Sequence, residues 1–306
     1  MKWLWALPVC VALLFGAGGR VRAADGEVVA PRPDRSARSS VYQPAATAGR
    51  LRLLTYNVAG LPGMLSSSDP SVNTTRLSPL LNHYDVVVAQ EDFAYHAELV
   101  EHVDHRYQES PKYPRSTMFG DGLAVLSRFP VESNARVRWQ ACNGYLLALS
   151  DCFAEKGFSA AELTLAHGAR VVVFNVHGDA GHSEGDVEAR RTGFAQLADY
   201  ISRHFTGSAL IVAGDTNLDD SDARDREILR RFKRSTGLSE VCREFTCRGA
   251  NLDRVLYRSS ARVSLKPRAW RADTRFVDAE GRDLSDHLPM AAEFEWAKHS
   301  SANPQR

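Results

Sequence analysis

The sequence predicts an α/β protein built as a four-layer αββα sandwich, in which two mixed β-sheets are flanked by helices. Three observations predict it. Short continuous runs of apolar and β-branched residues recur along the chain, which is typical of strands buried on both faces. Helical segments stand between some of these runs but do not alternate strictly with them. Tight turns between other runs indicate hairpins, which place antiparallel neighbours in the same sheet.

The chain has 306 residues, of which 44% are hydrophobic and 25% are charged, an ordinary globular composition. No internal repeat or linker divides its ordered part, so we expect one domain over residues 51–297. Residues 25–50 are rich in Ala, Arg, Pro and Ser without apolar periodicity, and we expect a flexible leader there. The polar residues 298–306 are expected to form a disordered tail.

Residues 1–24 have the pattern of a secretory signal peptide. Lys2 precedes an apolar run over 3–15, and small residues lead to Ala23 and Ala24, where we expect cleavage. The run is too short to span a bilayer, which disfavours an uncleaved anchor. Cleavage would remove three cations and no acid, so the formal net charge would fall from +1 to −2. That balance argues against a long DNA footprint but leaves local basic grooves open.

Five cysteines are present, and Cys10 lies in the predicted signal peptide. An even number in the remaining secreted chain suggests disulfides, and four cysteines allow three pairings. We favour the pairs that are nearest in sequence, Cys142–Cys152 and Cys242–Cys247. A zinc site is the alternative, but no Cys-x-x-Cys spacing occurs and no His lies close to either pair.

The first half of the domain is predicted from short apolar runs and the turn residues between them. Residues 51–58 are rich in apolar and β-branched side chains and end at a Gly-Leu-Pro-Gly turn. Residues 85–89 form a continuous apolar run, the mark of a fully buried strand. The predicted elements are, in order, a strand over 51–58, a helix over 76–83, a strand over 85–89, a helix over 94–104 and a strand over 123–127.

The second half contains the clearest helix, because Val187, Phe194, Leu197, Ile201 and Phe205 fall on one helical face. The predicted elements are, in order, a hairpin over 160–165 and 170–176, a helix over 187–205, a buried strand over 209–213, a charged helix over 222–234, a strand over 251–257 and a closing strand over 289–296. The basic run of the charged helix, Arg230 to Arg234, is interleaved with apolar residues. We interpret it as a solvated helix face rather than a nucleic-acid patch.

Polar residues stand at the ends of these strands, where the sheet would fix them rigidly. Carboxylates among them suit a hard cation such as Mg²⁺, which takes few protein ligands and keeps waters. Two histidines can serve as base and acid, and the amides can donate hydrogen bonds to phosphate oxygens. The set predicts attack of water on a phosphoester. It comprises Asn57, Glu91, His177, Asp215, Asn217, Asp253, Asp286 and His287.

Six motifs in chain order resemble those of the endonuclease/exonuclease/phosphatase superfamily, which includes deoxyribonucleases and neutral sphingomyelinases. The resemblance covers about residues 51–296, and one position departs from it: Gly178 stands where the family often has an apolar residue. The motifs are Thr55-Tyr56-Asn57-Val58, Gln90-Glu91, Asn175-Val176-His177, Gly214-Asp215-Thr216-Asn217, Leu252-Asp253-Arg254 and Ser285-Asp286-His287.

The resemblance implies a metal site. Glu91 would be the main metal ligand, with Asn57 beside it, and Asp286 would be a further ligand or would support one. The expected metal is Mg²⁺, with Mn²⁺ or Ca²⁺ as alternatives.

The resemblance also implies catalytic roles. Asp215 and Asn217 would orient the attacking water and the phosphate. His287 would be the general base, held in one tautomer by Asp253. His177 would stabilise the charged phosphate and assist the leaving oxygen. Taken singly, each of these residues has an ordinary structural explanation, such as a turn cap or an ion pair.

The family indicates the chemistry rather than the substrate. We prefer a secreted, sphingomyelinase C-like hydrolase of phospholipid at a membrane surface, because Asn57-Val58 leading to Leu61-Pro62 and Lys156-Gly157-Phe158 resemble the neutral sphingomyelinase branch. The alternative is a secreted DNase-like endonuclease. A phosphomonoesterase or a catalytically dead binding module is less favoured, because the motif set is complete. We expect a monomer without a protein partner, in an extracellular or periplasmic location.

The nuclease alternative requires a basic groove along the path of the nucleic-acid strand. Such a groove would be supplied by Arg115, Arg128, Arg136 and Arg138.

Overall fold

A computed structural model describes residues 47–62, 69–112, 120–144, 152, 154–247 and 252–299. The predicted signal peptide, the leader up to residue 46 and the tail from residue 300 lie outside the described residues. All described residues belong to one compact unit, Ala45–Arg306.

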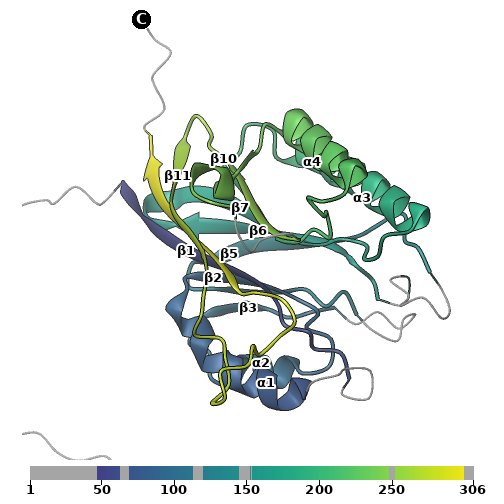
Figure 1. Cartoon of the computed structure of the whole chain (residues 1–306). Helices are drawn as coiled ribbons and strands as arrows, with labels where there is room; N and C mark the ends of the chain where they lie inside the picture. Colours follow the sequence, from purple (N-terminus) through teal and green to yellow (C-terminus); the bar gives the residue numbers. More distant parts are fainter. Residues whose placement is uncertain are drawn as a thin grey trace, which may run out of the picture. The chain divides into compact units, whose positions relative to one another are not determined.

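Two six-stranded mixed sheets form the inner layers of the described chain (Figure 1). The first has the strand order β11-β12-β1-β2-β4-β3, and the second has the order β5-β6-β7-β8-β10-β9. The strands of the first are β1 (Ala48–Asn57), β2 (Val86–Gln90), β3 (Tyr107–Glu109), β4 (Ala124–Ser127), β11 (Val263–Ala272) and β12 (Met290–Lys298). Those of the second are β5 (Val131–Arg138), β6 (Gly157–Leu165), β7 (Ala169–His177), β8 (Leu210–Asp215), β9 (Ser239–Glu240) and β10 (Asp253–Arg258).

Each sheet has one parallel pair near its centre. β1 and β2 are parallel, as are β7 and β8, while the other neighbours are antiparallel. The β6–β7 pair is the predicted hairpin. An apolar core between the sheets contains Leu53 and Val88 of the first together with Val173 and Ile211 of the second, all fully buried. The sheets therefore pack face to face.

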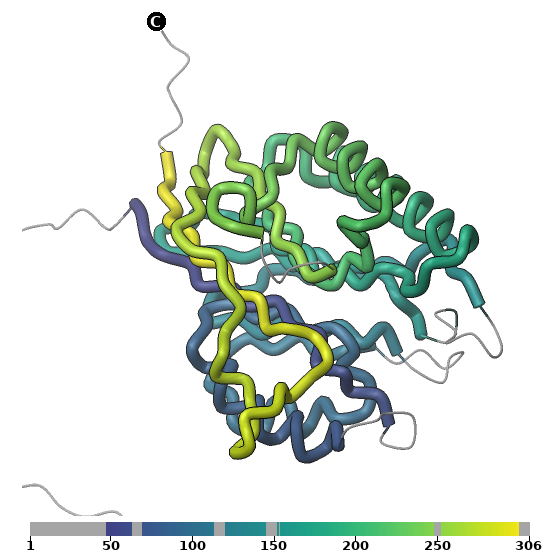
Figure 2. The backbone as a smooth tube through the Cα atoms, in the orientation of Figure 1, coloured from purple at the N-terminus to yellow at the C-terminus, as the bar shows by residue number. Residues whose placement is uncertain are grey.

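Helices cover the outer face of each sheet. α3 (Glu184–His204) and α4 (Ala223–Thr236) run side by side on the second sheet (Figure 2), with Phe194 of α3 and Phe232 of α4 in one buried cluster with its strands. The first sheet is covered by α1 (Pro70–Leu77), the 3-10 helix η2 (Ser78–His83) and α2 (His96–Val100). Short 3-10 helices also lie at η3 (Ala166–Gly168) and η4 (Val241–Glu244). The predicted four-layer fold class is confirmed.

Several boundaries differ from the prediction. The helix expected over 76–83 is instead α1 followed by η2. The start of α1 is capped by Asp69, whose side chain accepts a hydrogen bond from the Val72 N–H. Its continuation as an α-helix is interrupted at Pro79, which lacks the required N–H. The strand expected from residue 51 begins at Ala48, inside the predicted leader, and the closing strand extends to Lys298, inside the predicted tail. β3, β5, β9 and β11 were not predicted.

Both disulfides favoured from the sequence are present, Cys142–Cys152 and Cys242–Cys247. The second closes a short loop beside β9 and η4. No helix in the described part of the chain is long and apolar enough to cross a membrane.

Candidate active site

Five of the predicted site residues are brought together by the two parallel strand pairs and the adjoining strand β10. Asn57 ends β1, and Glu91 directly follows β2. In the second sheet, His177 and Asp215 are paired at the ends of β7 and β8, and Asp253 opens β10 opposite Asp215. The Asn57 side-chain amide donates to Asp215 Oδ2 at 3.2 Å. This bond joins the two sheets at the edge where all five residues lie.

A buried amide pair fixes the sheets directly beneath this edge. Gln90 Nε2 donates to Asn175 Oδ1 at 2.7 Å, and both side chains are fully buried. Asn175 Nδ2 donates in turn to the carbonyls of Ala89, at 2.8 Å, and Ala124, at 3.0 Å. Because Gln90 precedes Glu91 and Asn175 lies two residues before His177, the pair sets the separation of the catalytic candidates above it.

Glu91, His177 and Asp215 form a largely buried cluster, in which His177 and Asp215 are buried and the Glu91 side chain is 21% exposed. His177 Nε2 lies 3.7 Å from Glu91 Oε1 and 3.7 Å from Asp215 Oδ2, and neither ring nitrogen has a hydrogen-bond partner among the described residues. Burial lowers the pKa of His177 well below its ordinary value, so the ring is neutral near neutral pH. Burial raises the pKa of Glu91, and burial and the charge of Asp253 raise that of Asp215. The cluster thus holds two carboxylates whose negative charges are not fully balanced by nearby positive charges.

His287 lies beside this cluster with its own partner. Its Nδ1 lies 2.8 Å from Asp253 Oδ2, and its Nε2 lies 3.7 Å from Asp215 Oδ2. Burial lowers the pKa of His287, but the hydrogen bond with Asp253 and the charges of Asp215 and Asp253 outweigh it and raise the pKa to about 10. Ser285 fixes residues 285–287 against the end of β1. Its hydroxyl donates to the Asn57 carbonyl at 2.7 Å and accepts from the His287 N–H at 3.2 Å.

Two site residues have left-handed backbones that non-glycine residues rarely adopt. Glu91 has φ 56° and Asn217 has φ 51°. The Asn217 N–H donates to Asp215 Oδ1 at 3.0 Å, and its side-chain amide donates to the Gly178 carbonyl at 3.2 Å. A Cβ at position 178 would lie 2.2 Å from the Thr216 carbonyl oxygen. The close approach of these two loops therefore explains why glycine stands at position 178.

Asp286 is a predicted site residue that lies on the surface, outside the cluster. It is exposed, and its Oδ1 lies 3.4 Å from the Ser285 hydroxyl oxygen, whose hydrogen is directed to the Asn57 carbonyl. Its charge contributes to the raised pKa of His287. Among the described residues, Asp215, Asp253 and His287 also have ligand atoms within 4.8 Å of one another. Within this group, His287 Nδ1 and Asp253 Oδ2 are already within hydrogen-bonding distance of each other, while the buried Asp253 Oδ1 has no partner among the described residues.

Lys156 is a site residue to which the sequence reasoning gave no role. It precedes β6, is only 8% exposed, and its charge lowers the pKa of Glu91, His177 and Asp215. Lysine is seldom buried without a functional or ionic reason. In the sequence it stands out only as the first residue of the Lys156-Gly157-Phe158 motif.

A buried ion pair supports the loops that carry the site. Arg190 of α3 donates to both carboxylate oxygens of Asp225 of α4, at 3.0 and 2.9 Å. It also donates to the carbonyls of Asp179 and Gly181, in the loop after β7. Asp225 accepts from the N–H of Asp219, in the loop after β8. The pair holds the loops that follow His177 and Asp215, and no sequence motif indicated it.

Comparison with known proteins identifies the family of the chain. A sequence model of the Endonuclease/Exonuclease/phosphatase family matches residues 54–287, which include every predicted site residue. The chain belongs to the endonuclease/exonuclease/phosphatase family. Over 277 residues it is 32% identical to a sphingomyelinase of Mycobacterium tuberculosis, covering 83% of this chain and 54% of that protein. It thus spans about half the length of the curated relatives it matches.

Solved structures share the family fold at low sequence identity. A mutant of beta toxin from Staphylococcus aureus with bound magnesium ions has a TM-score of 0.57 and 16% identity, covering 80% of this chain and 99% of that one. D. rerio TDP2 in complex with a single-strand DNA product has a TM-score of 0.63 and 16% identity, covering 80% and 98%. At this identity the likeness supports the fold alone.

Proposed function

We propose that this family member is a secreted, Mg²⁺-dependent phosphodiesterase that hydrolyses a phospholipid in the manner of a sphingomyelinase C. The reaction class rests on one observation: the His287–Asp253 pair lies beside the cluster of Glu91, Asp215 and His177. The lipid substrate is supported by the 32% identity to a sphingomyelinase. The two disulfides favour an oxidising compartment outside the cytosol. We further propose that the protein acts as a monomer.

The cluster suits a divalent cation. Glu91 and Asp215 are carboxylates with raised pKa values, and the neutral His177 has two buried ring nitrogens without described partners. Oxygen-rich donors with little compensating charge are what Mg²⁺ prefers, with Mn²⁺ and Ca²⁺ as alternatives. Glu91 would hold the ion, with Asn57 and Asp215 beside it, and the exposed Asp286 would act through its charge. When bound, the ion supplies positive charge that stabilises the negative charge developing on phosphate.

His287 is proposed to accept the proton of the attacking water at Nε2. Its Nδ1 is engaged with Asp253, which leaves Nε2 as the atom that faces Asp215. Acceptance requires the neutral ring, whereas Asp253 and Asp215 raise the pKa of His287 to about 10 against the effect of burial. A cation among the same carboxylates would lower that pKa, because it offsets their charge. Proton acceptance by His287 is therefore coupled to occupation of the cluster.

The remaining side chains position the reacting groups. Asp215 is held by Asn57 and by the Asn217 N–H, so its carboxylate has a fixed direction from which to orient the water. Asn217 and Lys156 would contact phosphate oxygens with an amide and an ammonium group. The buried, neutral His177 would donate a hydrogen bond toward the leaving oxygen from beneath the site.

The alternative is a secreted endonuclease, which the fold shared with a DNA-bound TDP2 keeps open. The basic side chains expected to line its groove are, however, already engaged. Arg136 is largely buried and donates to Asp121 at 2.8 Å, Arg128 donates to Asp104 at 2.7 Å, and Arg138 donates to Glu155 at 3.3 Å. Arg115 lies outside the described residues. This neutralisation favours the lipid substrate.

A substrate panel tests the proposal. The purified protein with Mg²⁺ is incubated with sphingomyelin vesicles, phosphatidylcholine vesicles and supercoiled plasmid DNA, and with each again after addition of EDTA. We expect metal-dependent release of phosphocholine and intact plasmid. Cleavage of the plasmid without release of phosphocholine would establish the endonuclease instead.

A further inference from the structure

α4 carries an unusual concentration of cationic side chains. Between Ala223 and Thr236 it contains five arginines and one lysine, against two acidic residues. One of these acids, Asp225, is fully buried and is used by Arg190 of α3. The outer surface of α4 is therefore strongly positive, although the chain as a whole is close to neutral.

Carboxylates near α4 are shared rather than paired one to one. Glu227 is contacted by three arginines of the same helix, Arg230, Arg231 and Arg234.

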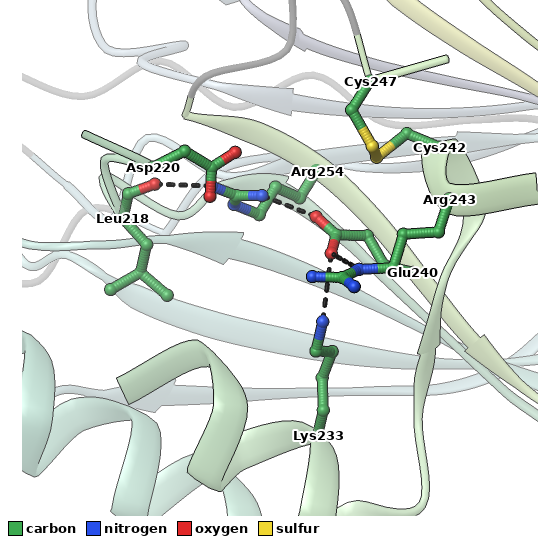
Figure 3. Close-up of a disulfide and its surroundings, with 8 residues drawn as sticks. All are labelled: Leu218, Asp220, Lys233, Glu240, Cys242, Arg243, Cys247 and Arg254. Atoms are coloured by element: carbon green, nitrogen blue, oxygen red, sulfur yellow. Dashed lines mark hydrogen bonds and ion pairs between the residues drawn. A yellow bond between two sulfur atoms is a disulfide. The ribbon is translucent and has the colours of Figure 1, made fainter. Parts of the chain in front are cut away.

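The buried Glu240 of β9 is contacted in the same way by Lys233 at 3.1 Å, Arg243 at 3.2 Å and Arg254 at 2.5 Å (Figure 3). Arg254 also contacts the Asp220 carboxylate at 2.8 Å, so these six cations share three carboxylates, which leaves three positive charges in excess. Arg226, which among the described residues donates only to the backbone carbonyls of Asp220 and Ser221, adds a fourth positive charge beside the same region.

The excess charge surrounds a cavity of about 520 Å³ beside α4 and η4. That volume lies within the range of small-molecule sites, roughly 300–1,000 Å³. Leu229 and Leu238, both buried, give it an apolar floor. None of the active-site residues described above lines it. The cationic side chains that do are Arg226, Arg230, Lys233, Arg234 and Arg243.

We propose that this cavity is a second binding site, which takes an anion bearing a phosphate group. Guanidinium groups bind phosphate oxygens in a fork of two hydrogen bonds, and several of them around one cavity suit more than one negative charge. The leucine floor suits the apolar part of an organic phosphate. The phosphate belongs either to a free compound or to the headgroup of an anionic lipid, and in both cases it is not the bond that the active site hydrolyses.

The phosphate chemistry is tested by measuring the binding of inorganic pyrophosphate to metal-free protein. Calorimetry gives the affinity, and the NMR methyl resonances of Leu229 and Leu238 show whether the ligand binds in the cavity. The test variant is the double substitution Arg230→Gln and Arg234→Gln. The matched control is Arg203→Gln, an exposed α3 arginine paired with Asp199 that does not line the cavity. We expect binding that shifts both methyl resonances in the wild type and the control, and about tenfold weaker binding in the double variant.

The source of the phosphate is tested by co-sedimentation with phosphatidylcholine vesicles that contain or lack phosphatidylglycerol. Sedimentation that requires phosphatidylglycerol, and that the double variant loses, supports the site and identifies a lipid headgroup. Pyrophosphate binding without vesicle binding supports the site and identifies a free phosphate compound. The proposal is overturned if pyrophosphate leaves the leucine resonances unchanged, or if the double variant binds both probes as tightly as the wild type.

Discussion

His287 Nδ1 lies 2.8 Å from Asp253 Oδ2, although 34 residues separate the two in sequence. His287 precedes β12 of the first sheet, and Asp253 opens β10 of the second. Their contact therefore exists only when the two sheets are packed together. A pair built in this way depends on the whole sandwich rather than on a local motif.

Replacement of Asp253 by Asn tests this pair. The amide cannot stabilise a charged imidazole, so we expect kcat to fall by about 10²-fold or more while KM changes less. His287→Ala should lose at least as much, about 10²–10⁴-fold. The measurement is the steady-state rate on the substrate that the panel identifies. Asp199→Asn on α3, an exposed carboxylate paired with Arg203, is the control and should keep full activity. Near wild-type rates in both site variants would remove the pair from catalysis.

Glu91→Gln tests the proposed cation site without relying on turnover. The substitution keeps the shape of the side chain but removes a charge from the cluster. We expect Mg²⁺ to bind about tenfold or more weakly, measured by isothermal titration calorimetry on chelator-treated protein. Circular dichroism should show an unchanged fold. An unchanged Mg²⁺ affinity would place the ion elsewhere.

Asn175→Ala tests the amide pair beneath the site. It removes the two bonds that Asn175 donates to the carbonyls of Ala89 and Ala124 and the bond it accepts from Gln90 Nε2, which keeps only longer contacts with Val88 and Thr55. Each unsatisfied buried group costs about 1–3 kcal/mol, so we expect the free energy of unfolding to fall by about 3 kcal/mol in urea titrations. A loss below about 1 kcal/mol would show that water or neighbouring groups replace these bonds.

Much of the site was visible in the sequence because its residues follow buried strands. Val86 to Ala89 is a continuous apolar run, so the position of Glu91 at a strand end could be predicted locally. The contact between Asn57 and Asp215 could not, since 158 residues separate them and only the packing of the two sheets brings them together. Lys156 was given no role for a related reason, because its burial is decided by the strands around it.

The missed strand boundaries have similar causes. Ala48, Gly49 and Arg50 have little β propensity, but β12 pairs with them, and the Trp296 ring packs so closely on Gly49 that a Cβ there would lie 2.8 Å from it. β5 is an edge strand whose side chains are largely polar, so its sequence carries no buried run. Tertiary pairing decides both segments.

Acid stability should depend on Asp273, which follows β11. Burial raises its pKa, but hydrogen bonds from Arg275 and Tyr84 outweigh burial and lower the pKa from 3.8 to about 2. A depressed pKa gives stability that is fully present above the ordinary value and is lost as the pH falls through the lowered one. We expect the stability difference between wild type and Asp273→Asn to shrink between about pH 4 and pH 2, measured by urea unfolding. A difference that stays constant over that window would contradict the shift.

The most direct test of the proposed function is to locate the oxygen that water delivers. Sphingomyelin vesicles are hydrolysed with Mg²⁺ in water labelled with heavy oxygen, and the products are weighed by mass spectrometry. Attack of a His287-activated water on phosphorus predicts that the label enters the phosphate of phosphocholine and not the ceramide. Label in the lipid product, or no phosphocholine at all, would contradict it.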